Sequence, residues 1–181
     1  KEALRQAEAM APCVLWIDEI EKSVANGTVD ADGGVSHRIL GSLLTWMNER
    51  HAKVFLVATA NDVSRLPPEL LRKGRFDEIF FVDLPSQAVR QDIFAIHLGK
   101  RNLDPRFFDL TQLSRASEGF SGSEIEQVVI DGMYRALGER ENPGTNHMLK
   151  ELSVTSPLSI VMHEKVASLR AWASGRTVPA D

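Results

Sequence analysis

Two carboxylates, Asp18 and Glu19, follow directly after the apolar run Cys13–Ile17. A continuous apolar run of this length fits a buried strand, and adjacent charges at its end are costly unless they have a chemical task there. One carboxylate can hold Mg²⁺, which prefers oxygen ligands and keeps several of its waters, while the other polarises an attacking water. The structural alternative is that both acids simply begin the next helix, where they suit its dipole.

A second apolar run, residues 54–60, ends in Asn61. If the two runs form neighbouring strands, Asn61 lies level with Asp18 and Glu19. A neutral amide in that place can donate to a phosphate oxygen or position a water. Taken alone, Asn61 followed by Asp62 fits a turn better than a functional site.

Two arginines, Arg72 and Arg75, flank a Lys-Gly turn just before a third apolar run at residues 78–84. The planar donor fork of a guanidinium group suits phosphate recognition. A single arginine here would fit an ordinary solvated surface. The pair on a glycine turn beside a strand is more specific, although it does not decide the matter alone.

A parallel sheet would position these side chains together. The first two apolar runs do not alternate with polar residues, which fits strands covered on both faces. Between them, apolar residues recur at helical spacing: Val35, Ile39, Leu40, Leu43, Leu44 and Met47. The order strand, helix, strand predicts an α/β sheet, and such sheets bind ligands at the carboxyl ends of their strands.

The sequence predicts two parts, an α/β part over residues 1–85 and an all-helical part over residues 86–181. No strong strand pattern follows Pro85. Helix caps are predicted at Ser86, Asp109 and Ser121. The last of these has Glu124 three residues later, which is the spacing of a capping box. A final helix is predicted over residues 163–173.

The composition limits the classes of function. Of 181 residues, 43% are hydrophobic and 25% charged, and the net charge is −4, so the chain can bury a core but shows no polycationic surface for nucleic acid. The single cysteine, Cys13, cannot form an internal disulfide, which fits a reducing compartment. No apolar run approaches the roughly 20 residues of a membrane span.

In this order, the motifs resemble the second half of an AAA+ ATPase module. RQAEAMAPCVLWIDEIEK is similar to the family's helix and Walker B strand, FLVATAND to its sensor 1, and LLRKGRFDEIFFVDLP to its arginine-finger segment. IFAIHLGKR and EGFSGSEIEQVV resemble the helical lid. Finer features such as TSPLSIVMHEKVASLRAW resemble the AAA+ proteins named after a hypothetical plastid reading frame, the Ycf type of bacteria and algae.

The resemblance implies an incomplete P-loop NTPase sheet with helices on both faces, carrying Walker B, sensor 1 and the following strand, and then an all-helical AAA lid domain. It implies ATP and Mg²⁺ as cofactors. Asp18 would support magnesium and Glu19 would activate water. Asn61 would be sensor 1. Arg72 and Arg75 would be fingers that reach the γ-phosphate bound by a neighbouring subunit.

In the lid, the resemblance places His97 near the adenine or ribose, and Gly122 and Ser123 in the sensor-2 turn. This type of AAA+ protein lacks the arginine that other branches carry in that turn. On the residues alone, His97 equally fits a core histidine, and Gly122 with Ser123 fits a plain helix start.

The sequence contains no G-x-x-x-x-G-K-[ST], and HLGKRN at residues 97–102 is a poor match within a predicted helix. Because the family's P-loop and first pore loop precede Walker B, the resemblance implies a truncated module. Such a chain would bind ATP weakly and be inactive alone, since the phosphate-cradling backbone and lysine are missing. Residues 26–34 are a candidate second pore loop.

HEKVA, residues 163–167, differs from the zinc motif H-E-x-x-H because Ala167 replaces the second histidine. Two imidazoles therefore cannot meet a metal one helical turn apart, and no zinc site is expected there.

The leading hypothesis is an ATPase that assembles as a homo-oligomeric ring, a hexamer in the first instance, and remodels a protein client. The alternative is a regulatory AAA+ protein that uses nucleotide as a switch with little turnover; the presence of both acids and both arginines argues against it. A DNA-handling machine is a third hypothesis, and the acidic balance disfavours it. The expected location is the cytoplasm, or the plastid stroma if the source is an alga, without a membrane partner.

Overall fold

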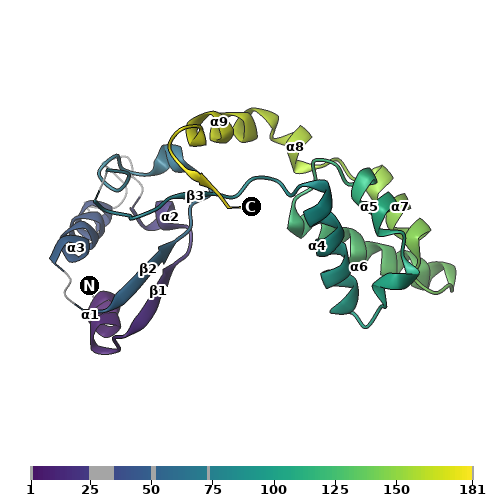
Figure 1. Cartoon of the computed structure of the whole chain (residues 1–181), viewed down its shortest axis with the longest axis horizontal. Helices are drawn as coiled ribbons and strands as arrows, with labels where there is room; N and C mark the ends of the chain where they lie inside the picture. The colour runs from purple at the N-terminus through teal and green to yellow at the C-terminus, as the bar shows by residue number, and fades with distance from the viewer. Residues whose placement is uncertain (1, 25–34, 50–51, 73, 181) are drawn as a thin grey trace. The chain divides into compact units, whose positions relative to one another are not determined.

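The computed structural model describes residues 2–24, 35–49, 52–72 and 74–180. The chain divides into two compact units, Lys1–Ile79 and Phe80–Asp181 (Figure 1). Each unit has a hydrophobic core of its own. The division falls a few residues before the predicted boundary after residue 85. The candidate pore loop, residues 26–34, lies outside the described residues.

The first unit is an α/β unit. Its elements in chain order are α1 (Glu2–Ala9), β1 (Cys13–Ile17), α2 (Ile20–Val24), α3 (Val35–Glu49), β2 (Val54–Ala58) and the 3₁₀ helix η1 (Val63–Arg65). The strands β1 and β2 pair in parallel, with Cys13 opposite Val54 and Ile17 opposite Ala58. The predicted strand–helix–strand order is therefore confirmed for this part of the chain.

One face of this two-stranded sheet is covered and the other is not. The side chains of Leu15 and Leu56 pack toward a core built with Leu40 and Leu43 of α3. On the opposite face, the apolar side chains are exposed: Val14 at 64%, Trp16 at 62% and Phe55 at 68%. The prediction of strands covered on both faces is thus wrong for the described residues. Alternate side chains point to opposite faces, and the helices of this unit cover only one of them.

The second unit is mainly helical. Its elements are β3 (Phe80–Phe81), α4 (Gln87–Gly99), η2 (Pro105–Phe107), α5 (Leu110–Ala116), α6 (Gly122–Glu139), α7 (Thr145–Val154), α8 (Leu158–Val161), α9 (His163–Ala173) and β4 (Val178–Pro179). The core is formed by side chains from α4 to α7, among them Phe94, Leu113, Ile125 and Met148, which are fully buried. Packing of amphipathic helices around this core accounts for the fold of the unit.

The predicted helix caps are confirmed. Ser86 accepts from the N–H of Val89, Asp109 accepts from Gln112, and Ser121 forms the capping box with Glu124. The final helix spans His163–Ala173, as predicted. These caps satisfy backbone N–H groups that the first turn of each helix leaves without partners.

The third apolar run differs from its prediction. Only Phe80 and Phe81 form a strand, and β3 pairs in parallel with β4 near the end of the chain rather than with the β1–β2 sheet. Asp83 and Arg170 reinforce this return of the chain, with Arg170 Nε 2.9 Å from Asp83 Oδ2. The second part is therefore not all-helical, because β4 near the end of the chain pairs with β3 at the start of the same unit. No described helix has both the length and the apolar character needed to cross a membrane.

Candidate functional site at the strand ends

The carboxyl ends of β1 and β2 lie side by side, because the strands are parallel and Ile17 pairs with Ala58. The residues that follow the strands therefore meet at one edge of the sheet. There Asn61 Nδ2 donates a hydrogen bond to Glu19 Oε1 at 2.8 Å, and the side chain of Asp18 is exposed. The structure thus brings together the acid pair and the amide that were expected at neighbouring strand ends.

Thr59 fastens the Asp18–Glu19 turn to the second strand. Its hydroxyl donates to Asp18 Oδ1 at 2.5 Å and accepts from the backbone N–H of Glu19 at 3.0 Å. Its backbone N–H donates to the carbonyl of Ile17 at 3.0 Å, and its carbonyl accepts from the N–H of Ile20 at 2.9 Å. Glu19 has φ 48°, a left-handed conformation that residues other than glycine seldom adopt. Backbone and side-chain bonds together hold this turn.

Glu21 is a buried carboxylate near the start of α2. It is 3% exposed, and its Oε1 accepts from the backbone N–H of Asn61 at 3.0 Å. Its Oε2 is buried and has no hydrogen-bond partner among the described residues. Glu21 therefore anchors the backbone of Asn61 while the Asn61 side chain contacts Glu19. Neither Glu21 nor Thr59 is among the predicted site residues; the only signal was a third acid after the pair and a hydroxyl at the end of an apolar run.

Both oxygens of the Glu19 carboxylate are engaged. Oε1 accepts from Asn61, and Oε2 accepts from Nζ of Lys22. The hydrogen bond to Glu19 and its charge raise the pKa of Lys22, with smaller contributions from the charges of Glu21 and Asp18. The Lys22 side chain is 63% exposed, and a solvent-exposed ion pair contributes little to stability. Glu19 Oε2 can therefore exchange Lys22 for water at low cost.

The two predicted finger arginines have different surroundings. Arg75 is half-buried and donates to the carbonyl of Leu44 at 3.2 Å and to the side-chain oxygen of Asn48, both on α3. Arg72 is exposed, and its guanidinium makes no hydrogen bond or ion pair to the described residues. Gly74 between them has φ 89°, which makes a turn there easy. Neither arginine contacts the strand-end carboxylates of its own chain.

The predicted lid residues lie together in the second unit, on α4 and α6. An added Cβ at Gly122 would lie 3.6 Å from Ile93 Cδ1, so the start of α6 packs closely on α4. One turn further along both helices, His97 Nδ1 lies 3.2 Å from Glu126 Oε1, without the alignment of a hydrogen bond. Ser123 Oγ lies 3.2 Å from the oxygen of Ser121, the cap of α6. His97 is thus a nearly buried histidine beside a carboxylate, at one end of a helix pair.

Residues 1–84 match the model of the family described as "ATPase family associated with various cellular activities (AAA)". The chain belongs to the AAA family. The matched residues include every strand-end residue described above as well as Arg72 and Arg75.

Similarity to individual AAA proteins extends over nearly the whole chain. The chain is 44% identical over 174 residues to the protein of Pyropia yezoensis named "uncharacterized AAA domain-containing protein ycf46". The aligned residues make up 96% of this chain and 35% of that protein. The protein of the same name from Trieres chinensis is 42% identical over 169 residues, 93% of this chain and 34% of that protein. A cell division cycle protein 48 homologue of Archaeoglobus fulgidus is 33% identical over 147 residues, 80% of this chain and 20% of that protein. The chain thus spans about a third of the length of the ycf46 proteins it matches.

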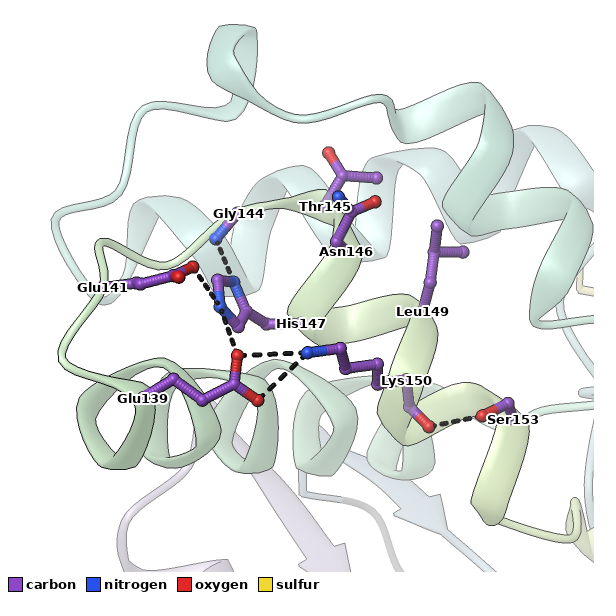
Figure 2. Close-up of a pocket in the computed structure, with 9 residues that line it drawn as sticks. All are labelled: Glu139, Glu141, Gly144, Thr145, Asn146, His147, Leu149, Lys150 and Ser153. Atoms are coloured by element: carbon purple, nitrogen blue, oxygen red, sulfur yellow. Dashed lines mark hydrogen bonds and ion pairs between the residues drawn. The ribbon is translucent and has the colours of Figure 1, made fainter.

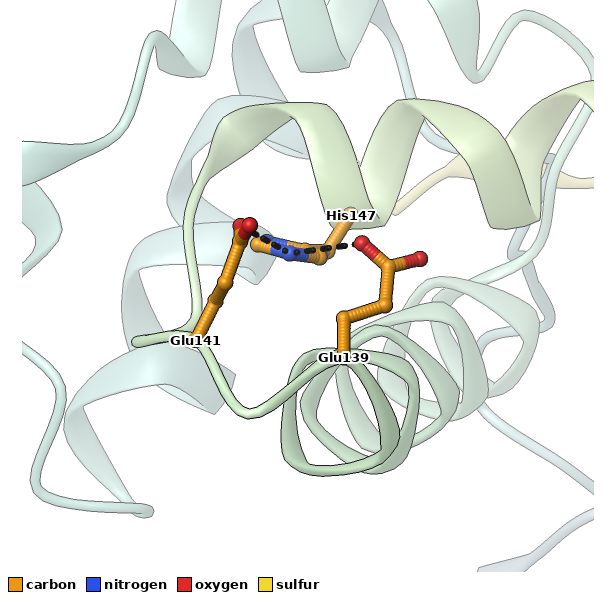
Figure 3. Close-up of side chains that lie close together, drawn as sticks. All are labelled: Glu139, Glu141 and His147. Carbon is orange, nitrogen blue, oxygen red and sulfur yellow. Dashed lines mark ion pairs between the residues drawn. The ribbon is translucent and has the colours of Figure 1, made fainter.

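A second polar cluster of this AAA chain lies at the turn between α6 and α7. It lines a hollow of about 760 Å³ (Figure 2) and contains Glu139, Glu141 and His147. One ligand atom from each of the three side chains lies within 4.8 Å of the others, a spacing that could suit a metal ion (Figure 3).

The hydrogen bonds of His147 disfavour a metal at this cluster. The backbone N–H of Gly144 donates to His147 Nδ1 at 3.1 Å, so Nδ1 carries no proton. In neutral imidazole the proton is then on Nε2, which lies 3.5 Å from Glu139 and 3.4 Å from Glu141. A metal needs an unprotonated nitrogen, and the one available is already used. Lys150 also donates to Glu139 and lowers the pKa of that carboxyl. Protein groups therefore already engage His147 Nδ1 and the Glu139 carboxylate.

Proposed function

We propose that the whole protein hydrolyses ATP with Mg²⁺ and uses the energy to remodel protein clients. The observation that carries this proposal is the hydrogen bond of 2.8 Å from Asn61 Nδ2 to Glu19 Oε1, with Asp18 beside it, at the ends of adjacent parallel strands. Membership in the AAA family supports the same proposal. An acid for a metal, an acid for water and an amide to orient them are among the groups that hydrolysis of a phosphoanhydride uses.

The residues at the strand ends fit Mg²⁺. Thr59 holds Asp18 Oδ1, whereas Oδ2 makes no hydrogen bond to the described residues and can accept from a metal-bound water. When bound, Mg²⁺ neutralises charge on the ATP phosphates. Glu19 exchanges Lys22 for a water and polarises that water, while Asn61 keeps the carboxylate oriented. Glu21 keeps the Asn61 backbone in place.

Arg72 and Arg75 are proposed to act on ATP bound by the next subunit of a homo-oligomeric ring, a hexamer in the simplest case. The exposure of Arg72 and its lack of a described partner support this role, because such a side chain is free to reach across an interface. Arg75 must first leave Leu44 and Asn48 of α3. The family relation supports assembly with copies of the same chain.

In the second unit, His97, Gly122 and Ser123 are proposed to lie near the base and sugar of the bound nucleotide. The close packing of the start of α6 on α4 supports this role, because it sets the distance between His97 and the Gly122–Ser123 turn. The single cysteine supports a reducing compartment, the cytoplasm or the plastid stroma.

One observation favours the second candidate, a nucleotide-switched regulator with little turnover. Both oxygens of Glu19 accept hydrogen bonds, from Asn61 and from Lys22, and each such bond makes the carboxylate a weaker base toward water. The exposure of Lys22 favours the hydrolytic proposal, since its contact is easily exchanged.

The substitution Glu19→Gln in the whole protein separates the two candidates. For an ATPase, it keeps ATP binding and lowers kcat by a hundredfold or more, since an amide is a poor base (roughly 10²–10⁴ for a general base). Glu69→Gln is the matched control, because Glu69 is an exposed acid of the same unit. Turnover and nucleotide affinity are measured for both. Unchanged turnover in Glu19→Gln, or none in the parent protein, would contradict the hydrolytic proposal.

A further inference from the structure

Among the described residues, only Thr59 has a side chain that hydrogen-bonds both Asp18 and Glu19. Its hydroxyl donates to the carboxylate of Asp18 and accepts from the backbone N–H of Glu19, at 2.5 Å and 3.0 Å. One hydroxyl therefore bonds both residues of the acid pair at once. It bonds the side chain of one and the backbone of the other, so it sets the position of the acids relative to the second strand.

The junction of the two strands does not need this hydroxyl. The backbone N–H of Thr59 bonds Ile17, and its carbonyl accepts from Ile20. These two bonds continue the pairing of β1 and β2 whatever the side chain is. The hydroxyl is therefore an addition to a junction that the backbone already closes, and it acts on the orientation of the turn.

The conformation of the turn explains why an additional bond is useful. Glu19 has φ 48°, a left-handed conformation that is strained for a residue with a side chain. Its N–H is satisfied by Thr59 Oγ1. Without that acceptor, the Glu19 N–H would have to find water, and Asp18, which is exposed, would be free to change rotamer.

We propose that Thr59 is a positioning residue for the acid pair. Its hydroxyl holds Asp18 Oδ1, which leaves Oδ2 as the oxygen that would accept from a metal-bound water, and it holds the backbone of Glu19, whose carboxylate accepts from Asn61. This inference rests on the proposed function for its catalytic consequence, but the geometric claim stands on the hydrogen bonds of the chain itself.

Two substitutions in the whole protein test the claim. Thr59→Val has nearly the shape of threonine and lacks the hydroxyl, whereas Thr59→Ser keeps the hydroxyl. Thr111→Val on α5 is the control for replacing an exposed threonine hydroxyl, since no side-chain bond of Thr111 is involved in the site. Melting temperatures within a few degrees of the parent protein establish that all variants are folded.

The first measurement is hydrogen exchange of the Glu19 amide without nucleotide. Thr59→Val is expected to raise its exchange rate by about tenfold or more, the loss of one hydrogen bond of about 1.4 kcal/mol, while Thr59→Ser and Thr111→Val leave it within about twofold. Equal exchange in Thr59→Val and the parent protein would overturn the proposal. So would a Thr59→Ser variant that behaves like Thr59→Val.

The second measurement is the Mg²⁺ dependence of nucleotide binding and of turnover. Thr59→Val is expected to raise the Mg²⁺ concentration for half-maximal nucleotide binding several-fold. It should also lower kcat by roughly tenfold or more with KM for ATP nearly unchanged, because misplacing reacting groups costs rate. A protein that binds nucleotide but never hydrolyses it, with the exchange and Mg²⁺ shifts present, would refute the proposed hydrolysis and support the positioning role. Hydrolysis in the parent protein without either shift in Thr59→Val would refute the positioning role alone.

Discussion

The strand-end site and the His147 cluster both gather acids around a polar side chain, but they differ in which atoms remain available. At the strand ends, Asp18 Oδ2 has no described partner and Glu19 Oε2 is held by an exposed lysine. In the cluster, the backbone occupies the acceptor nitrogen of His147, and Lys150 occupies Glu139. Proximity of ligand atoms alone does not distinguish a site from a structural cluster. The two are distinguished by whether the ligand atoms keep lone pairs that no protein group engages.

The two regions also differ in how their scaffold is built. The His147 cluster (Glu139, Glu141 and His147) stands on α6 and α7, which carry the fully buried core side chains Val129 and Met148. The strand-end site stands on a two-stranded sheet with Val14, Trp16 and Phe55 exposed on one face. Because one face of the sheet is uncovered, the bonds of Thr59 and Glu21 at the strand ends add to the support that the covered face gives the site.

The largest expected effect concerns the arginines, and it sharpens the claim that the strand-end site is completed by a second copy. In the whole protein, Arg72→Ala should lower kcat by roughly 10³ or more, since an arginine supplied in trans is worth about 10³–10⁵ in phosphoryl transfer. Its melting temperature should not change, because Arg72 has no described partner. Arg75→Ala should lower both kcat and melting temperature, since Arg75 also bonds α3.

A mixing experiment tests the trans geometry directly. Whole protein carrying Arg75→Ala is combined with whole protein carrying Glu19→Gln, each nearly inactive alone. In a mixed ring, some interfaces pair an intact Glu19 with an intact Arg75 of the neighbour, so part of the activity returns. If mass measurement confirms mixed assembly and no activity returns, Arg75 acts within its own subunit or only supports α3.

A smaller effect, on stability, is expected for substitutions of His147, and it tests whether this cluster is structural in contrast to the strand-end site. His147→Leu removes the acceptor for the Gly144 N–H and should destabilise the chain by about 1–3 kcal/mol in denaturant unfolding. His147→Gln should cost clearly less, because glutamine at this helix position can accept the same backbone N–H in a capping box. His163→Leu is the control, since His163 is an exposed histidine at the start of α9.

The same variants test the cluster for metal binding. An excess of Zn²⁺ should leave the melting temperature of the parent chain unchanged, because a ligand stabilises only a folded state that binds it. A rise in melting temperature that His147→Leu abolishes would show that the cluster is a metal site after all, and the distinction drawn from its hydrogen bonds would be wrong.

Much of the site could be predicted because it depends on local patterns and on parallel pairing. The apolar runs before Asp18 and Asn61 indicate strands, and parallel strands of one sheet end at the same edge. The capping box at Ser121 and Glu124 is a local pattern too, and it is present. The roles in catalysis remain predictions, because they depend on a nucleotide and on a second subunit.

The rest depends on non-local geometry. The importance of Thr59 follows from the left-handed φ of Glu19, which no residue pattern announces. The pairing of Phe80 with Val178 and of Phe81 with Pro179 joins segments far apart in the sequence through strands of two residues, too short to give an alternating pattern. An apolar run such as Val14–Trp16 shows that both faces are apolar, but not whether anything covers them. The contact of Arg75 with α3 is likewise a long-range side-chain bond.

The smallest expected effect concerns the ion pair that returns the end of the chain to β3. Partial burial alone would raise the pKa of Asp83, but hydrogen bonds from Arg170 and from the Leu84 N–H lower it below its ordinary value. Because the pKa is lower in the folded than in the unfolded state, the pair stabilises the fold above the ordinary carboxyl pKa of about 3.9. That stabilisation is lost as the pH falls through the lowered pKa of Asp83.

Arg170→Met should therefore reduce the free energy of unfolding at pH 7 by less than about 1 kcal/mol, as both side chains are substantially exposed. The difference from the parent chain should vanish in acid, below the lowered pKa. Arg176→Met is the matched control, because Arg176 bonds the carbonyl of Trp172, which does not titrate, so any cost should persist in acid. Denaturant unfolding at neutral and acidic pH measures both. A cost of Arg170→Met that is the same at both pH values would mean that the Arg170 side chain acts through packing, and that its charge contributes nothing measurable through Asp83.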